Sequence, residues 1–120
     1  MLFRSQAFSF AGYLPQQPEA RLQAARALEQ RSARSGETVL MIETPYRNQA
    51  LFETLLSALS GECRLMVAAS LTLPDQTVQT QTVTAWRART VVLAKVPTVF
   101  GLLAPRSASA HVGRPRARSR

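Results

Sequence analysis

Two short segments hold the residues best suited to chemistry. The first, Glu43 to Asn48, reads ETPYRN and directly follows an apolar run. It places a carboxylate, a hydroxyl and a guanidinium where a buried strand would lead into the amino terminus of a helix. Ligands of open α/β sheets bind beyond the carboxyl ends of strands, where free backbone N–H groups also collect. The segment is therefore a candidate ligand site.

Arg47 adds a second argument for this segment. A cation in the first turn of a helix opposes the helix dipole, at a cost of about 0.3–1 kcal/mol. Arg47 is therefore expected to have an anionic partner, either Glu43 or a bound ligand. The alternative is a structural role only, a capped helix with a Glu43–Arg47 pair, and the residues alone favour that alternative.

The second segment reads AASLTLPDQ at residues 68–76. Small residues at the end of a strand let a ligand approach the backbone closely. Ser70 and Thr72 offer hydroxyl groups, and the loop offers unpaired backbone amides. An ordinary polar loop closed by Pro74 and Asp75 is the simpler interpretation from the residues alone.

Other reactive or aromatic side chains are isolated. Trp86 and Tyr13 lack interleaved basic residues, and Trp86 is expected to pack in the core rather than stack on a base. His111 and Cys63 have no catalytic partners nearby, and one histidine with one cysteine cannot form the usual four-ligand zinc site. The five glycines form no phosphate-binding loop. The chain alone therefore lacks the parts of a complete enzyme.

Charge is distributed unevenly along the 120 residues. The net charge is +8, but residues 1–105 hold ten basic and seven acidic residues and so carry only +3. The remaining five basic residues are all arginines in residues 106–120, a segment of mainly Arg, Ser and Ala that predicts a disordered basic tail. Residues 1–105 are expected to form one domain. No signal peptide or membrane-spanning run is visible, which predicts a cytoplasmic protein.

The elements that must position the two segments follow from apolar runs and breakers. The expected strands span residues 8–10, 38–43, 64–69, 77–83 and 96–103, and the expected helices span residues 18–34 and 45–59, with a helical turn near Trp86. Thr44 is the expected N-cap and Pro45 the first residue of the second helix. The order predicts an α/β fold: a mixed sheet of about five strands with two main helices.

Three stretches also carry a family resemblance. They read FSFAGYLP at residues 8–15, ETPYRN at residues 43–48 and ASLTLPDQTVQTQTV at residues 69–83, and Trp86 and PTVF at residues 97–100 follow in order. Residues 6–104 thereby resemble the C-terminal half of S-adenosylmethionine (SAM)-dependent methyltransferases of the tetrapyrrole (corrin/porphyrin) methylase superfamily. The bacterial branch of ribosomal-RNA ribose methyltransferases is the most similar. Ser70 stands where that branch often has an acidic residue.

The resemblance implies a two-domain enzyme that holds SAM between its domains. This sequence lacks the N-terminal domain, which would be on a separate chain or lost. By position, the resemblance implies cofactor contacts from Glu43, Thr44, Ser70, Leu71, Thr72, Pro97 and Thr98. Arg47 is the expected substrate-binding residue, and no residue is assigned as catalytic base. No metal is implied.

Two functions follow as expectations. The first is methyl transfer from SAM, with RNA as the expected substrate class, by a fragment whose activity alone is doubtful. The alternative is a non-catalytic fragment that binds RNA or a partner chain. Loss of the N-terminal domain would expose apolar surface, and exposed patches of this kind drive association, so a homodimer or poor solubility is expected.

Overall fold

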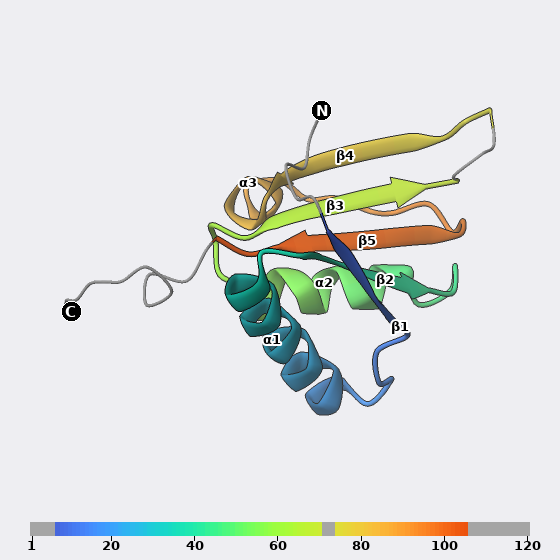
Figure 1. The fold of residues 1–120 in the computed structure, drawn as a ribbon. Helices are drawn as coiled ribbons and strands as arrows, with labels where there is room; N and C mark the ends of the chain where they lie inside the picture. The colour runs from blue at the N-terminus through green and yellow to red at the C-terminus, as the bar shows by residue number, and fades with distance from the viewer. Residues whose placement is uncertain (1–6, 71–73, 106–120) are drawn as a thin grey trace.

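The computed structural model describes residues 7–70 and 74–105. Five strands and three helices follow one another within these residues (Figure 1). In chain order they are β1 (Phe8–Gly12), α1 (Pro18–Ser35), β2 (Thr38–Glu43), α2 (Asn48–Ala58), β3 (Arg64–Ala69), β4 (Thr77–Thr82), α3 (Val83–Arg87) and β5 (Thr98–Leu103). The predicted α/β class and both main helices are confirmed. The predicted tail, residues 106–120, lies outside the described residues.

The strands form one mixed sheet with the order β1-β2-β5-β3-β4. The pairing of β1 with β2 is parallel, and the other three pairings are antiparallel. The last strand of the described chain, β5, therefore lies between β2 and β3 (Figure 1). Because both neighbours are antiparallel to β5, β2 and β3 point the same way and end at the same edge of the sheet.

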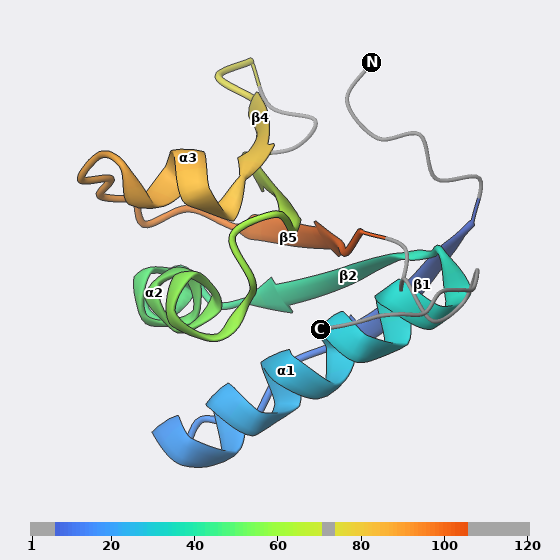
Figure 2. The same cartoon turned by 90° about the vertical axis from the view of Figure 1, so that its left-hand side faces the viewer.

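The helices lie on one face of the sheet (Figure 2). Alternate residues of the central strands point toward them, and this face forms the core. Its buried side chains include Val39, Met41, Leu65, Val67, Phe100 and Leu102 from the strands, with Leu51, Phe52 and Leu55 from α2. Trp86 of α3 completes the core, since its ring meets Phe52 edge-on with centroids 5.4 Å apart and its Nε1 donates to Leu65 O. The predicted core position of Trp86 is confirmed.

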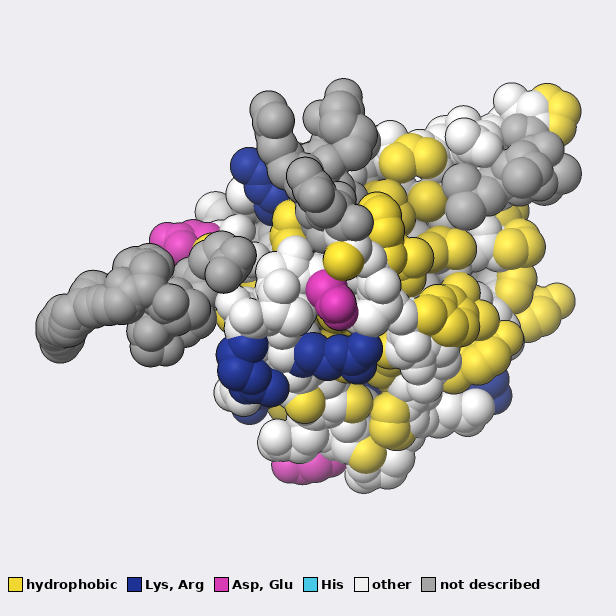
Figure 3. Space-filling model, viewed as in Figure 1, with side chains coloured by type: hydrophobic (Ala, Val, Ile, Leu, Met, Phe, Trp, Pro, Cys, Tyr) yellow, Lys and Arg dark blue, Asp and Glu magenta, His cyan; other side chains and the backbone are white. Residues whose placement is uncertain are grey.

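No helix of the described residues lies on the other face of the sheet. Leu40, Ile42, Met66 and Val99 project from it in register and are only partly buried. At its β1 edge the exposed fractions of Phe8 and Phe10 are 57% and 63%. Figure 3 shows apolar side chains gathered across this surface, which we call the open face. Within the described residues, no helix is long and apolar enough to cross a bilayer.

Two predicted starts are wrong. Thr44 is not the N-cap of α2 and Pro45 is not its first residue: residues 45–47 form a turn, in which the Arg47 N–H donates to Thr44 O, and α2 begins at Asn48. A tertiary contact of Asn48, described next, fixes that start. β5 likewise begins at Thr98 rather than Val96, because Pro97 has no N–H to donate to the ladder.

Asn48 ties the start of α2 to residues 88–97, a segment without helix or strand that we call the strap. The buried Asn48 Nδ2 donates to Ala94 O at 2.8 Å and lies 3.3 Å from both Val96 O and Thr98 Oγ1. Gln49 adds two bonds, from its Nε2 to Val91 O and from Leu93 N–H to its Oε1. Two adjacent amides therefore hold the strap against α2 and lead it into β5.

Replacing Asn48 with Ala should lower the free energy of unfolding by roughly 1–3 kcal/mol, because strap carbonyls lose their donor in a buried setting. The measurement is urea unfolding followed by the fluorescence of Trp86, the only tryptophan. Ser57→Ala, on the exposed side of the same helix, is the control and should change stability by less than about 0.5 kcal/mol. Equal effects of the two substitutions would contradict this role of Asn48.

Cys63 should behave as a buried neutral thiol. Burial, aided by the negative charge of Glu29, raises the pKa of its thiol from 9.0 to about 12. The unfolded chain therefore loses this proton at lower pH than the folded chain, so the contribution to stability is present below pH 9 and is lost as pH rises toward 12. Urea unfolding across this range should show a shallower fall in stability for Cys63→Ala than for the wild type. If the free energy of unfolding falls equally steeply with pH in both proteins, Cys63 is not a buried neutral thiol.

Candidate functional site

A pocket lies at the edge of the sheet where β2 and β3 end and β5 begins. Its cavity volume is about 330 Å³. The lining residues are Tyr13, Ile42, Glu43, Thr44, Pro45, Ser70, Pro97, Thr98 and Val99. The antiparallel insertion of β5 creates this arrangement, since Thr98 is the register partner of both Glu43 and Ala69. Four segments far apart in sequence thus line one pocket, which we call the edge pocket.

Most of the residues singled out from the sequence meet here. Of the seven expected cofactor contacts, five line the edge pocket: Glu43, Thr44, Ser70, Pro97 and Thr98. The other two, Leu71 and Thr72, lie outside the described residues. Arg47 does not line the pocket and is exposed.

The expected anionic partner of Arg47 is not found within the described chain. No ion pair joins Arg47 to Glu43, because the Glu43 carboxylate turns back to accept the Thr44 N–H instead. Arg47 also precedes α2 rather than occupying its first turn, so the dipole argument does not apply as predicted. Its guanidinium is open to solvent two residues beyond the pocket wall.

Glu43 is the pocket residue with an unusual environment. Its side chain is 6% exposed, and its Oε1 accepts the Thr44 N–H at 2.8 Å. Its Oε2 is buried and has no hydrogen-bond partner in the described residues. Buried polar atoms are nearly always paired, and leaving one unpaired is costly. This oxygen is therefore suited to accept a hydrogen bond from a hydroxyl or amino group of a ligand.

Ser70 closes the pocket with a rare backbone conformation. Its φ of 56° makes it the one residue other than glycine with positive φ in the described chain. A hydrogen bond of 3.0 Å from its N–H to Pro97 O fixes this bend beside the start of β5. Such conformations cost roughly 1–3 kcal/mol and cluster at ligand sites. The bend turns the chain out of β3 at the pocket wall.

The sequence placed Asn48 in the first candidate segment but did not predict its role, which is to brace Thr98. Thr98 Oγ1 donates to Val96 O at 2.9 Å and lies 3.3 Å from Asn48 Nδ2. Asn48 therefore links the helix, the strap and the pocket. A usable signal existed, since Asn48 lies three residues before Leu51 and seven before Leu55 and so shares the buried face of α2. The sequence also did not predict the apolar lining of the pocket by Ile42, Pro45 and Val99. Nor did it predict that the exposed Tyr13 would line the pocket.

The edge pocket combines an unpaired carboxylate oxygen with mostly apolar walls. Such walls can hold a flat or aliphatic group, and the carboxylate can orient a polar one. Its volume lies at the small end of the ~300–1,000 Å³ typical of ligand sites, which suits a half-site with one wall supplied elsewhere. Three His, Cys, Asp or Glu side chains placed to bind a metal ion are not found in residues 7–70 and 74–105.

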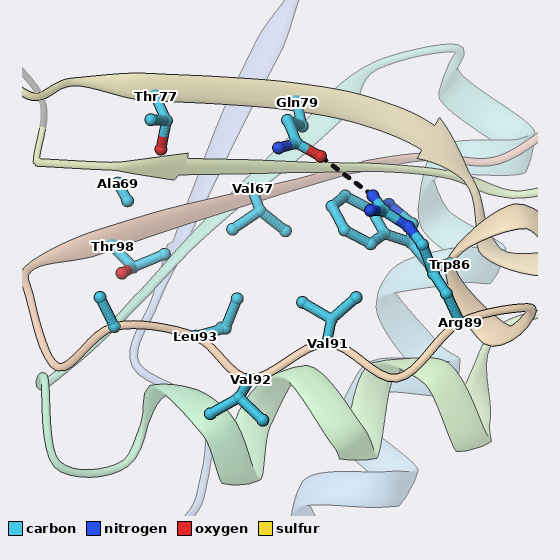
Figure 4. Close-up of a pocket in the computed structure, with 11 residues that line it drawn as sticks. Val67, Ala69, Thr77, Gln79, Trp86, Arg89, Val91, Val92, Leu93 and Thr98 are labelled. Atoms are coloured by element: carbon cyan, nitrogen blue, oxygen red, sulfur yellow. Dashed lines mark hydrogen bonds between the residues drawn. The ribbon is translucent and has the colours of Figure 1, made fainter.

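A second pocket, of about 210 Å³, lies on the helix side of the sheet between β4 and the strap (Figure 4). Val67 forms its floor, and Val91 and Leu93 of the strap form one wall. Arg89 closes one end: its guanidinium lies 5.3 Å from the Trp86 ring centroid, and its Nη2 donates to Gln79 Oε1 at 3.1 Å. The sequence did not predict this pocket.

Comparisons with known proteins show the fold. No family model matches the chain, and no curated protein matches it in sequence. Among solved structures, the crystal structure of the methyltransferase CobJ is similar, with a TM-score of 0.52 and 17% identity. The similarity covers 88% of this chain and 44% of the CobJ chain, so this chain spans less than half of that protein. The chain therefore has a methyltransferase-like fold.

Proposed function

We propose that this chain is the C-terminal, cofactor-binding half of a SAM-dependent methyltransferase of the tetrapyrrole methylase superfamily. One observation carries the proposal. Five of the seven residues that the sequence resemblance assigns to SAM, although separated by up to 55 positions, line a single pocket at one edge of the sheet. The likeness to CobJ supports a methyltransferase-like fold, and this chain spans 44% of the CobJ chain.

The edge pocket fits the chemical groups of SAM. Glu43 Oε2 would accept a hydrogen bond from a ribose hydroxyl or an amino group, which would satisfy an oxygen that is otherwise unpaired. Ile42, Pro97 and Val99 would pack against the flat adenine. SAM supplies an electrophilic methyl group, and the role of this chain would be to hold it in position.

RNA is the proposed substrate class. The net charge of +8 favours a polyanionic partner, and Arg47 presents an exposed guanidinium close to the pocket wall. The second candidate is a non-catalytic fragment that binds RNA through its arginines. That candidate is favoured by the concentration of five arginines in residues 106–120, away from the pocket residues in sequence.

S-adenosylhomocysteine is the product of methyl transfer from SAM. In isothermal titration it should bind the full chain with a dissociation constant in the micromolar range, which corresponds to a binding free energy of about −8 kcal/mol. Glu43→Gln should weaken this binding about tenfold or more, because an amide accepts hydrogen bonds less strongly than a carboxylate. The matched control is Glu62→Gln, an exposed carboxylate at the opposite end of β3.

Each outcome of this titration has a clear meaning. Binding that Glu43→Gln weakens and Glu62→Gln leaves unchanged supports a SAM half-site at the edge pocket. Equal loss in both variants would point to a nonspecific charge effect. An absence of heat up to millimolar ligand would contradict the proposal that the chain carries a preformed half-site.

RNA affinity should depend on the arginines of residues 106–120. For a single-stranded RNA, five phosphate contacts give a slope of log K against log salt of at most about −3.5. Fluorescence anisotropy of a labelled oligonucleotide should show a slope that becomes shallower by up to this amount when residues 106–120 are deleted. If deletion leaves affinity and slope unchanged, the basic segment does not bind RNA. In that case Arg47→Ala tests the pocket rim.

A further inference from the structure

The second pocket, between β4 and the strap, is a feature that the edge pocket does not explain. We call it the strap pocket. It lies on the helix side of the sheet and has a volume of about 210 Å³. Of its lining residues, only Thr98 also lines the edge pocket. Protein interiors are normally close-packed, with few voids larger than a water molecule. The strap pocket is therefore a separate space that is large enough to hold a ligand.

The strap pocket is preformed because its wall is fixed from behind. Gln49 of α2 accepts from the Leu93 N–H and donates to Val91 O, and Asn48 donates to Ala94 O. These bonds attach the strap to α2 rather than to β4, which leaves the space between the strap and the sheet. A ligand would not have to order this wall on binding, and preorganised sites lose less affinity to such ordering.

Most of the strap pocket is apolar. Val67 of β3, 7% exposed, forms the floor, and the side chains of Val91 and Leu93 form the wall on the strap side (Figure 4). The last two also pack against the hydrophobic core, so they are held in place. The Trp86 ring lies at one end. Surfaces of this kind favour a ring or a branched aliphatic group.

The same end of the strap pocket carries a positive charge without an acidic partner. Arg89 lies over the Trp86 ring and donates from Nη2 to Gln79 Oε1, and these contacts fix its guanidinium. No described acidic residue lines the pocket, and the sequence contains no acidic residue after Asp75. Gln79 is neutral, so the charge of Arg89 is not compensated there. Arginine is well suited to bind a carboxylate through paired hydrogen bonds.

The volume limits the size of the ligand. An apolar cavity of about 150 Å³ holds one benzene molecule. The strap pocket, at about 210 Å³, is larger by roughly the space of one small polar substituent. It therefore fits a single ring with a carboxylate, and it is too small for a nucleotide or for SAM.

We propose that the strap pocket binds a small monocarboxylate that carries one ring or one branched aliphatic group. The carboxylate would lie against the Arg89 guanidinium, and the apolar group would lie over Val67 between the strap and β4. The proposal does not depend on whether the edge pocket binds SAM, since the two pockets share only Thr98.

The first test is isothermal titration of the full chain with benzoate. A ligand of this size makes few contacts, so we expect a dissociation constant of about 0.1–1 mM. Two matched ligands separate the contributions to binding. Benzamide has the shape of benzoate without its charge, and acetate has the charge without the ring. Each should bind at least tenfold more weakly than benzoate does.

Arg89→Gln should weaken benzoate binding at least tenfold and leave benzamide binding unchanged, because it removes the charge and retains a polar side chain. Arg31→Gln is the matched control: it removes the same charge from an exposed position on α1 and should have no effect. Glu43→Gln, in the edge pocket, should also leave benzoate binding unchanged. Failure of the SAM proposal and failure of this one are therefore distinguishable.

A second measurement locates the bound ligand. Trp86 is the only tryptophan and lines the strap pocket, so its indole N–H resonance should shift as benzoate saturates the protein. Ala69→Leu adds a larger side chain to the pocket lining and should abolish this shift by filling the space. If that variant fails to fold, the comparison of benzoate with benzamide in the wild type still decides.

Several results would overturn the proposal. These are the absence of benzoate binding at several millimolar, acetate binding as strong as benzoate binding, or an equal loss of affinity in Arg31→Gln and Arg89→Gln. A Trp86 resonance that stays constant while benzoate binds would also overturn it, since the ligand would then lie elsewhere. Benzoate binding that requires both the ring and the charge, and that Arg89→Gln weakens selectively, supports it.

Discussion

The insertion of β5 between β2 and β3 is the constraint on which the rest of the structure depends. β2 and β3 each make their central pairing with β5 and not with each other. Phe100 and Leu102 of β5 complete the core between them, and Thr98 brings the two strand ends together at the edge pocket. Without β5 the sheet would divide into two pairs of strands, and the pocket would lose its middle wall.

A small set of polar contacts then fixes where β5 starts. Pro97 cannot donate to the ladder, and its carbonyl accepts from the bent Ser70 instead. Asn48 holds the strap carbonyls from the other side. The position of the edge pocket is thus determined by one amide and one unusual backbone bend, whereas the shape of the sheet is determined by apolar burial.

Local patterns predicted most of the fold. Continuous apolar runs located β2 and β3, and the leucines of α2 marked its buried face, because such signals depend on burial that repeats with the period of each element. The start of α2 was wrong, since Thr44 and Pro45 have good capping chemistry but the tertiary bonds of Asn48 place the helix later. The order of strands could not be read from local patterns, because it depends on which distant strand pairs with which.

The candidate site was predicted by family resemblance rather than by physics alone. The residues themselves favoured a Glu43–Arg47 pair, which the structure does not contain in its described part. Spacing could not show that Ile42 and Val99 would join the same pocket, because that contact exists only once β5 lies between its neighbours. The open face was expected only as exposed apolar surface, and its location required the register of the sheet.

The late position of β5 also affects how the protein is made. About 60 residues separate the end of β2 from the end of β5. At a synthesis rate of about 5–20 residues per second, β2 therefore waits roughly 3–12 s for its central partner. During that interval its apolar edge is unpaired and can pair with the wrong strand. This exposure of β2 ends only when β5, the last described strand, has emerged.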